Sequence, residues 1–124
     1  MAEITLTSDL LTVHVQGVER WLALKSQLDI PLNHVTQAEA LPIGEEEWTS
    51  WSALRAPGTV LPGVIRAGSF LQHGEWVFWD VRHPQKALTI HLAGEQYVKL
   101  VVEVEDPVAA ASAIQAAIRS QAGA

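Results

Sequence analysis

The sequence predicts an α+β domain that is mainly β: a strongly bent antiparallel sheet or partial barrel of about seven short strands, with one C-terminal helix over its open end. Two observations support this prediction. Apolar and polar residues alternate in short runs through most of the chain, which is typical of strands with one buried face. The last part of the chain changes to helical spacing, so strands come first and the longer helix comes last. At 124 residues the chain is expected to form one domain, residues 1–124.

The first half of the chain predicts a hairpin followed by two further strands. Ser8-Asp9 is a turn pair between two alternating runs, which indicates the hairpin. Residue 30 is expected to be extended, because Pro31 disfavours helical backbone at the position before it. Residues 17–24 favour one or two helical turns. The expected strands of this half are residues 4–6, 11–16, 28–32 and 35–41.

Leu41–Pro57 differs in character and predicts an insertion loop that contains a short helix. Trp48 and Trp51 lie three residues apart, and Leu54 or Arg55 follows one turn later, so a helix would stack these side chains on one side. Three glutamates at 45–47 would lie at the favourable N-terminal end of this helix. Such an acidic run is usually a solvated helix start, and a cation site or an acid/base pair is the alternative.

The second half predicts a hairpin and a last pair of strands. Pro57-Gly58 and Pro62-Gly63 are two turn signals close together. Arg66–Gln72 and Glu75–Arg82 face each other across His73-Gly74, a two-residue connection typical of hairpins. The next turn and the remaining strands are expected at residues 83–86, 88–92 and 98–104.

Asp106-Pro107 predicts the start of the C-terminal helix, residues 107–119. Aspartate is a favoured N-cap, and proline at the first helical position loses no hydrogen bond. Apolar residues then follow at helical spacing: Ala110, Ile114, Ala117 and Ile118. Because alanine is a weak hydrophobe, we expect this helix to pack closely on the sheet and to cover its open end.

Several short motifs stand out along this order of elements. Ile30-Pro31-Leu32 precedes Val35 at the start of a strand, Asp106-Pro107 leads into the last helix, and residues 55–63, Gly68 and 78–81 form glycine-rich and aromatic blocks. Together they are similar to bacterial pleckstrin-homology-like (PH-like) domains over nearly the whole chain. The resemblance implies a seven-stranded bent sheet with a C-terminal capping helix. Eukaryotic relatives in fold bind phosphoinositides through a basic strand-loop-strand near the start. Here the first turn is Ser8-Asp9, so binding of lipid head groups is not expected.

Composition and charge narrow the classes of function. A formal charge of −6 argues against nucleic-acid binding, which needs a basic face, and against docking on anionic membranes. The chain has no cysteine, so disulfides and thiolate metal sites are excluded and the expected compartment is the cytoplasm. The start, Met1–Ile4, has no basic region or long apolar segment and is not expected to be a signal peptide.

No constellation of residues predicts a reaction. The five histidines lack the spacing of a helical metal motif, and His14, His34 and His91 would form a site only if the strands gathered them. The sequence contains no G-x-S-x-G nucleophile elbow and no phosphate- or dinucleotide-binding glycine pattern. We therefore expect no catalytic residue, no metal, no cofactor and no enzymatic activity.

The aromatic residues predict a protein-binding surface. Tryptophan and arginine are the usual anchors of protein interfaces, so Trp48, Trp51 and Arg55 are the expected partner-binding residues. An exposed strand edge could add a strand from the partner. The expected function is a non-catalytic binding or scaffolding domain that engages a protein partner or a second copy of itself.

A small-ligand binding protein or enzyme is the alternative interpretation. Asp80 lies between apolar neighbours in an expected strand, and a carboxylate there needs a partner such as Arg66 or Arg82. The side chains of Arg66, Asp80 and His91 would supply the polar groups of a ligand pocket inside the bent sheet. This interpretation requires those three side chains to converge.

Overall fold

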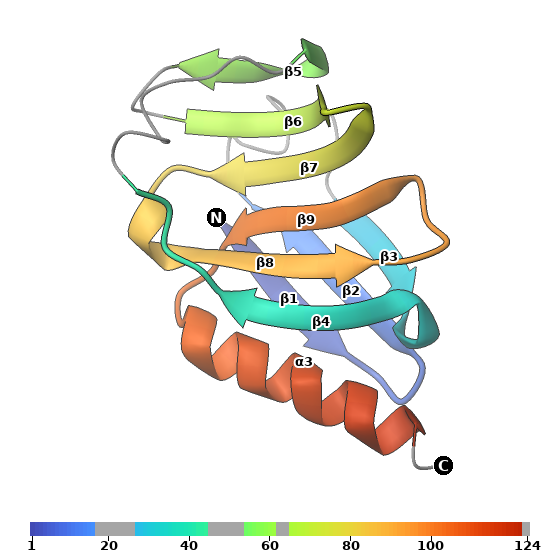
Figure 1. Ribbon diagram of the computed structural model, residues 1–124. Coiled ribbons are helices and arrows are strands. Elements are labelled where there is room, and N and C mark those ends of the chain that lie inside the picture. Colours follow the sequence, from blue (N-terminus) through green and yellow to red (C-terminus); the bar gives the residue numbers. More distant parts are fainter. Residues whose placement is uncertain (17–26, 45–53, 62–64, 123–124) are drawn as a thin grey trace.

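Two β-sheets and one C-terminal α-helix form the part of the chain that the computed structural model describes, residues 1–16, 27–44, 54–61 and 65–122 (Figure 1). The three-stranded sheet has the order β1-β2-β3, and the six-stranded sheet has the order β4-β8-β9-β7-β6-β5. The predicted α+β class, mainly β with a helix at the end, is confirmed. The strands are β1 Ala2–Leu6, β2 Leu10–Val15, β3 Gln27–Pro31, β4 Val35–Ala40, β5 Leu54–Leu61, β6 Ile65–Gln72, β7 Glu75–Val81, β8 Ala87–Leu92 and β9 Tyr97–Glu103.

The N-terminal sheet begins with the predicted hairpin. β1 and β2 pair antiparallel, and β3 pairs antiparallel with the other side of β2. Thr7 closes the hairpin turn, because the Leu10 N–H donates to its Oγ1 at 3.1 Å. A short 3-10 helix, η1 (Leu32–His34), then turns the chain, so that β4 starts in the other sheet. The helical turns predicted at residues 17–24 lie outside the described residues.

The β6–β7 hairpin also forms as predicted. Gln72 lies opposite Glu75, which leaves His73 and Gly74 as the two-residue turn. Their φ angles are 52° and 79°, and a tight turn of this kind needs positive φ at both central positions. Glycine adopts such angles without strain, which explains why it holds the second position.

The six-stranded sheet contains one parallel pair, β7 with β9, so the prediction of an antiparallel sheet was wrong at this point. β8 and β9 form an antiparallel hairpin, and β9 inserts between β7 and β8. The connection from β7 to β8, which contains η2 (Pro84–Lys86), therefore spans the width of an intervening strand. Turn-forming residues indicate that a chain reverses, but they do not indicate how far it moves sideways before pairing.

Nine strands in the described residues replace the predicted seven, partly because the turn signals in residues 54–61 concealed β5. Residues 54–57 are strand, so the predicted insertion loop is wrong over that part. The pairing of β5 with β6 shifts register between Arg55 and Gly58. Pro57-Gly58 therefore belongs to a bulge in an edge strand and is not a turn, and edges and bulges are where sheets tolerate proline.

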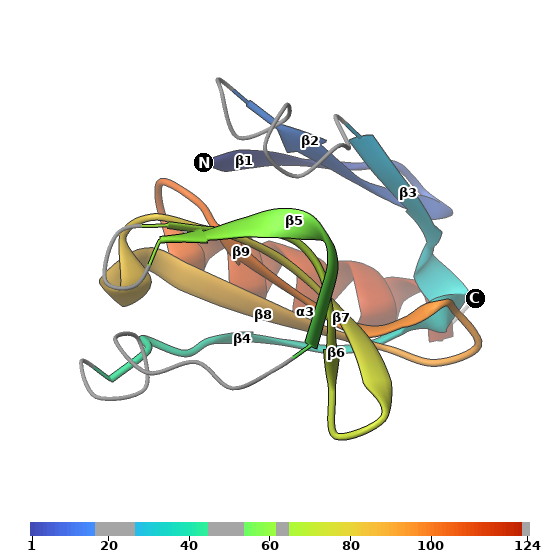
Figure 2. The same cartoon turned by 90° about the horizontal axis from the view of Figure 1, so that it is seen from above.

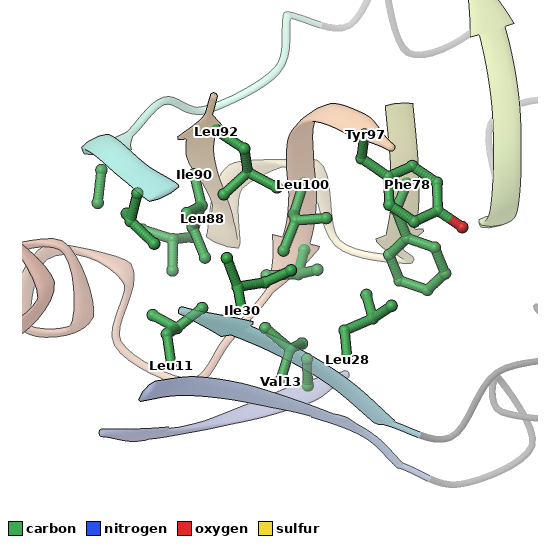
Figure 3. Close-up of a cluster of buried hydrophobic side chains, with 14 of the residues drawn as sticks. Leu11, Val13, Leu28, Ile30, Phe78, Leu88, Ile90, Leu92, Tyr97 and Leu100 are labelled. Atoms are coloured by element: carbon green, nitrogen blue, oxygen red, sulfur yellow. The ribbon is translucent and has the colours of Figure 1, made fainter. Parts of the chain in front are cut away.

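The two sheets lie face to face as separate layers and do not join into the predicted single bent sheet or partial barrel (Figure 2). Figure 3 shows apolar side chains of the two layers pointing toward one another. Burial of each such side chain contributes about 1.5–3 kcal/mol, so this layer is the main source of stability. The facing residues are Leu11, Val13, Leu28 and Ile30 of the three-stranded sheet and Leu88, Ile90 and Leu100 of the six-stranded sheet.

Helix α3 (Pro107–Ala122) closes one end of the space between the sheets, which confirms the predicted helix and its covering role (Figure 2). Asp106 caps it, because the Ala109 N–H donates to Asp106 Oδ1 at 3.1 Å. Ile114 is fully buried in the core between the sheets. The helix contacts β4, β8, η1 and β1, and thus elements of both layers.

Replacing Ile114 tests how much the helix contributes to the fold. Ile114→Ala removes a fully buried side chain and leaves a cavity, so the free energy of unfolding should fall by about 2–5 kcal/mol in urea titrations. Val108→Ala on the same helix is the matched control, because Val108 is 67% exposed and its loss should change stability by less than about 0.5 kcal/mol. Equal effects of the two substitutions would show that α3 does not pack on the core as described.

Candidate functional site

Strand β4 forms one edge of the six-stranded sheet. Among the strands that the structure describes it pairs only with β8, antiparallel, with Ala38 opposite Ile90 and Ala40 opposite Leu88. The other side of β4 therefore presents backbone groups that no strand of its own sheet takes up. An exposed strand edge is a template for pairing with another chain, and proteins usually cover or block it.

One of these outward backbone groups is occupied by a side chain of the helix. The Ala38 N–H donates to the Gln115 Oε1 of α3 at 2.7 Å. This bond shows that the Ala38 N–H points away from β8. Because backbone groups alternate in direction along an antiparallel strand, the Ala40 N–H points outward in the same way. The Gln115 carboxamide thus takes the place of a neighbouring strand at one position of the edge.

An open groove runs between β4 and α3, with a volume of about 440 Å³. Its walls are the outer side of an edge strand and one side of a helix, a shape that suits an extended segment better than a compact small molecule. The residues that line it are Ala38, Glu39, Ala40, Val108, Ala111, Ser112, Gln115 and Arg119.

Two charged side chains of the groove differ in their surroundings. Glu39 Oε2 lies 2.9 Å from His91 Nε2 on β8, so this carboxylate already has a partner. Arg119 is exposed, and none of the described residues forms an ion pair with it. The groove therefore offers one cation for a ligand in a chain whose formal charge is −6.

The predicted aromatic anchors fall largely outside the described residues. Trp48 and Trp51 lie in the range 45–53, which the structure does not describe. Arg55 has its backbone in β5 opposite Phe70, and its side chain is outside the description. The partner-binding role of these three residues stays a prediction.

Arg66 and Asp80 lie on neighbouring strands but on opposite faces of the sheet. The Arg66 guanidinium lies over the ring of Trp79, with Cζ 5.0 Å from the centroid. Trp79 immediately precedes Asp80, and successive side chains of a strand point to opposite faces. Asp80 is fully buried, with Oδ2 3.7 Å from the Met1 amino nitrogen.

His91 is on β8, which β9 separates from the strand of Asp80, β7, and which β9 and β7 together separate from the strand of Arg66, β6. Neighbouring strands are about 4.8 Å apart, so Arg66 on β6 is roughly 14 Å away across the sheet. The structure therefore does not bring Arg66, Asp80 and His91 together, although Arg66 and Asp80 are each buried. The convergence that the ligand-pocket interpretation required is not observed.

The histidines do not form a metal site within the described ranges. No three histidine, aspartate or glutamate side chains there gather into a group that could hold a metal ion. His34 Nδ1 lies 2.5 Å from Glu95 Oε2, while His91 bonds to Glu39. Each of these two rings is thus oriented by a single carboxylate, an arrangement suited to fixing loops and strand edges.

A buried carboxylate holds the β7–β8 connection. Glu103 of β9 is 1% exposed and accepts hydrogen bonds from the Arg82 and His83 N–H groups at 2.9 and 2.6 Å, while its Oε2 lies 2.8 Å from His83 Nδ1. Burial by itself raises the pKa of Glu103, but these hydrogen bonds favour the charged form and hold the pKa below its ordinary value. The sequence did not indicate this role, because the alternation of the strand assigns Glu103 to the face that is expected to point toward solvent.

The features of the β4–α3 groove were only partly predictable. The alternation of residues 35–41 predicted the strand, and a strand edge was expected to bind a partner. Gln115 and Arg119, in contrast, are ordinary polar residues of an alanine-rich helix, and only their position beside β4 distinguishes them. The available signal was Gln115, a polar residue that directly follows the buried Ile114 in an alanine-rich helix.

Comparisons of this chain with protein-family models, with curated proteins and with solved structures find no match. Within the described residues, α3 and the other helical segments are too short or too polar to cross a lipid bilayer.

The hydrogen bonds to Glu103 predict a pH-dependent contribution to stability. A carboxylate with a lowered pKa stabilises the fold fully above its ordinary value of 4.5, and this stabilisation is lost as the pH falls through the folded-state pKa. Glu103→Gln should lower the free energy of unfolding at pH 7 by about 1–3 kcal/mol, and the difference from wild type should shrink in acid.

Urea unfolding of both proteins between about pH 7 and pH 3 measures this difference, since this range includes the ordinary glutamate pKa of 4.5. Glu75→Gln is the control, because this substitution makes the same chemical change at an exposed residue. A wild-type advantage that stays constant into acid would contradict the role given to the Glu103 charge.

Proposed function

We propose that this chain is a non-catalytic binding domain that takes up an extended segment, from a protein partner or a second copy, along the free edge of β4. The single observation that carries the proposal is the Ala38–Gln115 hydrogen bond, because it shows that the edge points its donors into an open groove. An added strand would bond to the backbone of β4, with α3 as the side wall. This mode of recognition takes affinity from main-chain bonds and selectivity from the groove.

The energetics favour a modest and reversible interaction. Each backbone hydrogen bond formed in exchange for water contributes about 0.5–1.5 kcal/mol, and β4 is only six residues long. A bound strand would also replace the Gln115 carboxamide at Ala38, which offsets part of the gain. Contacts with α3 or with neighbouring segments must therefore add to the affinity.

The aromatic anchors remain part of this proposal. β4 ends at Ala40, and the segment that carries Trp48 and Trp51 begins directly after it at Leu41. One end of a partner strand on β4 would therefore lie beside the start of that segment. Tryptophans near such an edge would supply the large apolar contacts on which interfaces depend. Arg55 is on β5, at the opposite edge of the sheet, and would have to act there.

The PH-like relationship is proposed as the origin of the fold. It is supported by Asp106-Pro107 at the start of α3 and by the position of this helix over the end of the two layers. The parallel pairing of β7 with β9 and the nine described strands depart from the seven-stranded antiparallel sheet that the resemblance implies. No part of the binding proposal depends on the family.

A proline in the edge of β4 tests the proposal. In Ala40→Pro the outward N–H is lost and the ring blocks strand addition, while the bonds to β8 stay intact. A phage library of random octapeptides, panned against the wild-type protein, should yield clones that bind it and bind Ala40→Pro at least tenfold more weakly, as measured by plate binding.

Ser8→Pro is the matched control. Ser8 is the second residue of the β1–β2 turn, where proline is favoured, and it belongs to the three-stranded sheet and does not line the β4–α3 groove. The selected clones should bind this variant like wild type. Clones that bind wild type and Ala40→Pro equally well, or a library that yields no clone at all, would refute binding at the β4 edge.

A further inference from the structure

We infer that the β4–α3 groove selects extended acidic protein segments: a strand antiparallel to β4 in which an apolar side chain is followed, four or six residues later, by an aspartate or glutamate. This inference rests on the proposed function and names the partner of the same groove. It follows from the direction of the two walls, the chemistry at each end of the groove and the spacing between those ends.

The two walls of the groove run in opposite directions (Figure 1). The start of α3 lies beside the end of β4, and the end of α3 lies beside the start of β4. Gln115 fixes this alignment, because it bonds to Ala38 in the middle of the strand. Val108 therefore lies at the end of the groove near Ala40, and Arg119 lies toward the other end.

The end near Ala40 is apolar. Val108 is 67% exposed and Leu41 is 46% exposed, and they are the two large hydrophobic residues in the described ranges that stand out as exposed. Leu41 directly follows β4, and Val108 lines the groove together with Ala40. An apolar side chain of a ligand would cover Val108 in the groove and remove its surface from water.

The other end carries a cation. Arg119 is the positively charged residue of the groove lining and is exposed, while the carboxylate of Glu39 is bonded to His91. A carboxylate is the complementary group, and Arg119 can hold it with two parallel hydrogen bonds. A basic segment would gain nothing there, and it would meet no carboxylate that is free of a partner in the described lining.

The spacing follows from the geometry of helix and strand. Val108 and Arg119 are eleven residues apart in α3, which corresponds to about 16 Å along a helix. An extended chain covers this distance in about five residues. Because side chains of a strand alternate between faces, two that both point toward α3 are an even number of residues apart, which leaves four or six. In antiparallel addition, the commoner arrangement, the acidic residue follows the apolar one.

Blocked decapeptides that contain one leucine, one glutamate and otherwise threonine test the inference by fluorescence anisotropy. With the glutamate four or six residues after the leucine, replacing glutamate by glutamine should weaken binding about three- to fivefold, the upper part of the range of exposed ion pairs. With a spacing of five, or with the order of the two residues reversed, the same replacement should change binding less than about 1.5-fold, since the charge is then misplaced.

Charge reversal of the protein completes the experiment. Arg119→Glu should bind the glutamate peptide about tenfold more weakly and should prefer the peptide that carries lysine in its place, and added salt should reduce both effects. Arg82→Glu lies directly after β7, which β8 and β9 separate from β4, and it makes the same change in net charge at an exposed position; it should behave as wild type. Arg119 is exposed, so the variant is expected to fold.

The outcomes separate this inference from the proposed function. If peptides bind wild type but not Ala40→Pro, and the acidic residue or Arg119 has no effect, the groove binds strands without this selectivity and the inference is wrong. If Ala40→Pro binds the peptides as well as wild type, the β4 edge is not the site and both proposals are wrong. Binding that follows the spacing and the charge at Arg119 supports both.

Discussion

The packing of α3 into the end between the two sheets is the constraint on which the rest of the structure depends. Ile114 is fully buried in the common core, and four partly buried residues, Ala110, Ala111, Ala117 and Ile118, pack around it. Because most of these side chains are small, the helix backbone comes close to the sheets. This close approach brings Gln115 within hydrogen-bonding distance of Ala38, and it makes the helix a wall beside β4.

The topology of the larger sheet explains why β4 lies at an edge. β9 inserts between β7 and β8, so the remaining side of β8 is taken by β4, and the order ends there. This arrangement requires a β7–β8 connection that spans a strand width, and Glu103 holds that connection through the backbone of Arg82 and His83. The buried Glu103 carboxylate at the end of β9 and the Gln115 carboxamide of α3 thus accept hydrogen bonds from backbone N–H groups that the strand pairing leaves unsatisfied.

Local patterns predicted the local elements well. The alternation in residues 4–16, the His73-Gly74 turn and the Asp106-Pro107 cap each depend on contacts within a few residues, and each was found where expected. The split into two sheets, the parallel β7–β9 pair and the bulged strand at Pro57-Gly58 depend on which distant strands pair, which single-residue preferences do not encode. The candidate site follows the same division, because β4 was predicted, whereas Gln115 and Arg119 acquire their significance from tertiary packing.

Amide hydrogen exchange, followed residue by residue by NMR, tests the central claim most directly. Within β4 the Ala38 amide should exchange slowly because Gln115 accepts its hydrogen bond, while the outward Ala40 amide should exchange much faster than that of Leu100 in the interior of the sheet. In Gln115→Ala the protection of Ala38 should fall to the level of Ala40, with Leu100 unchanged. Two results would contradict this account of the β4 edge. One is an Ala40 amide that exchanges as slowly as that of Leu100 in the free protein, and the other is an Ala38 amide whose exchange rate does not change in Gln115→Ala.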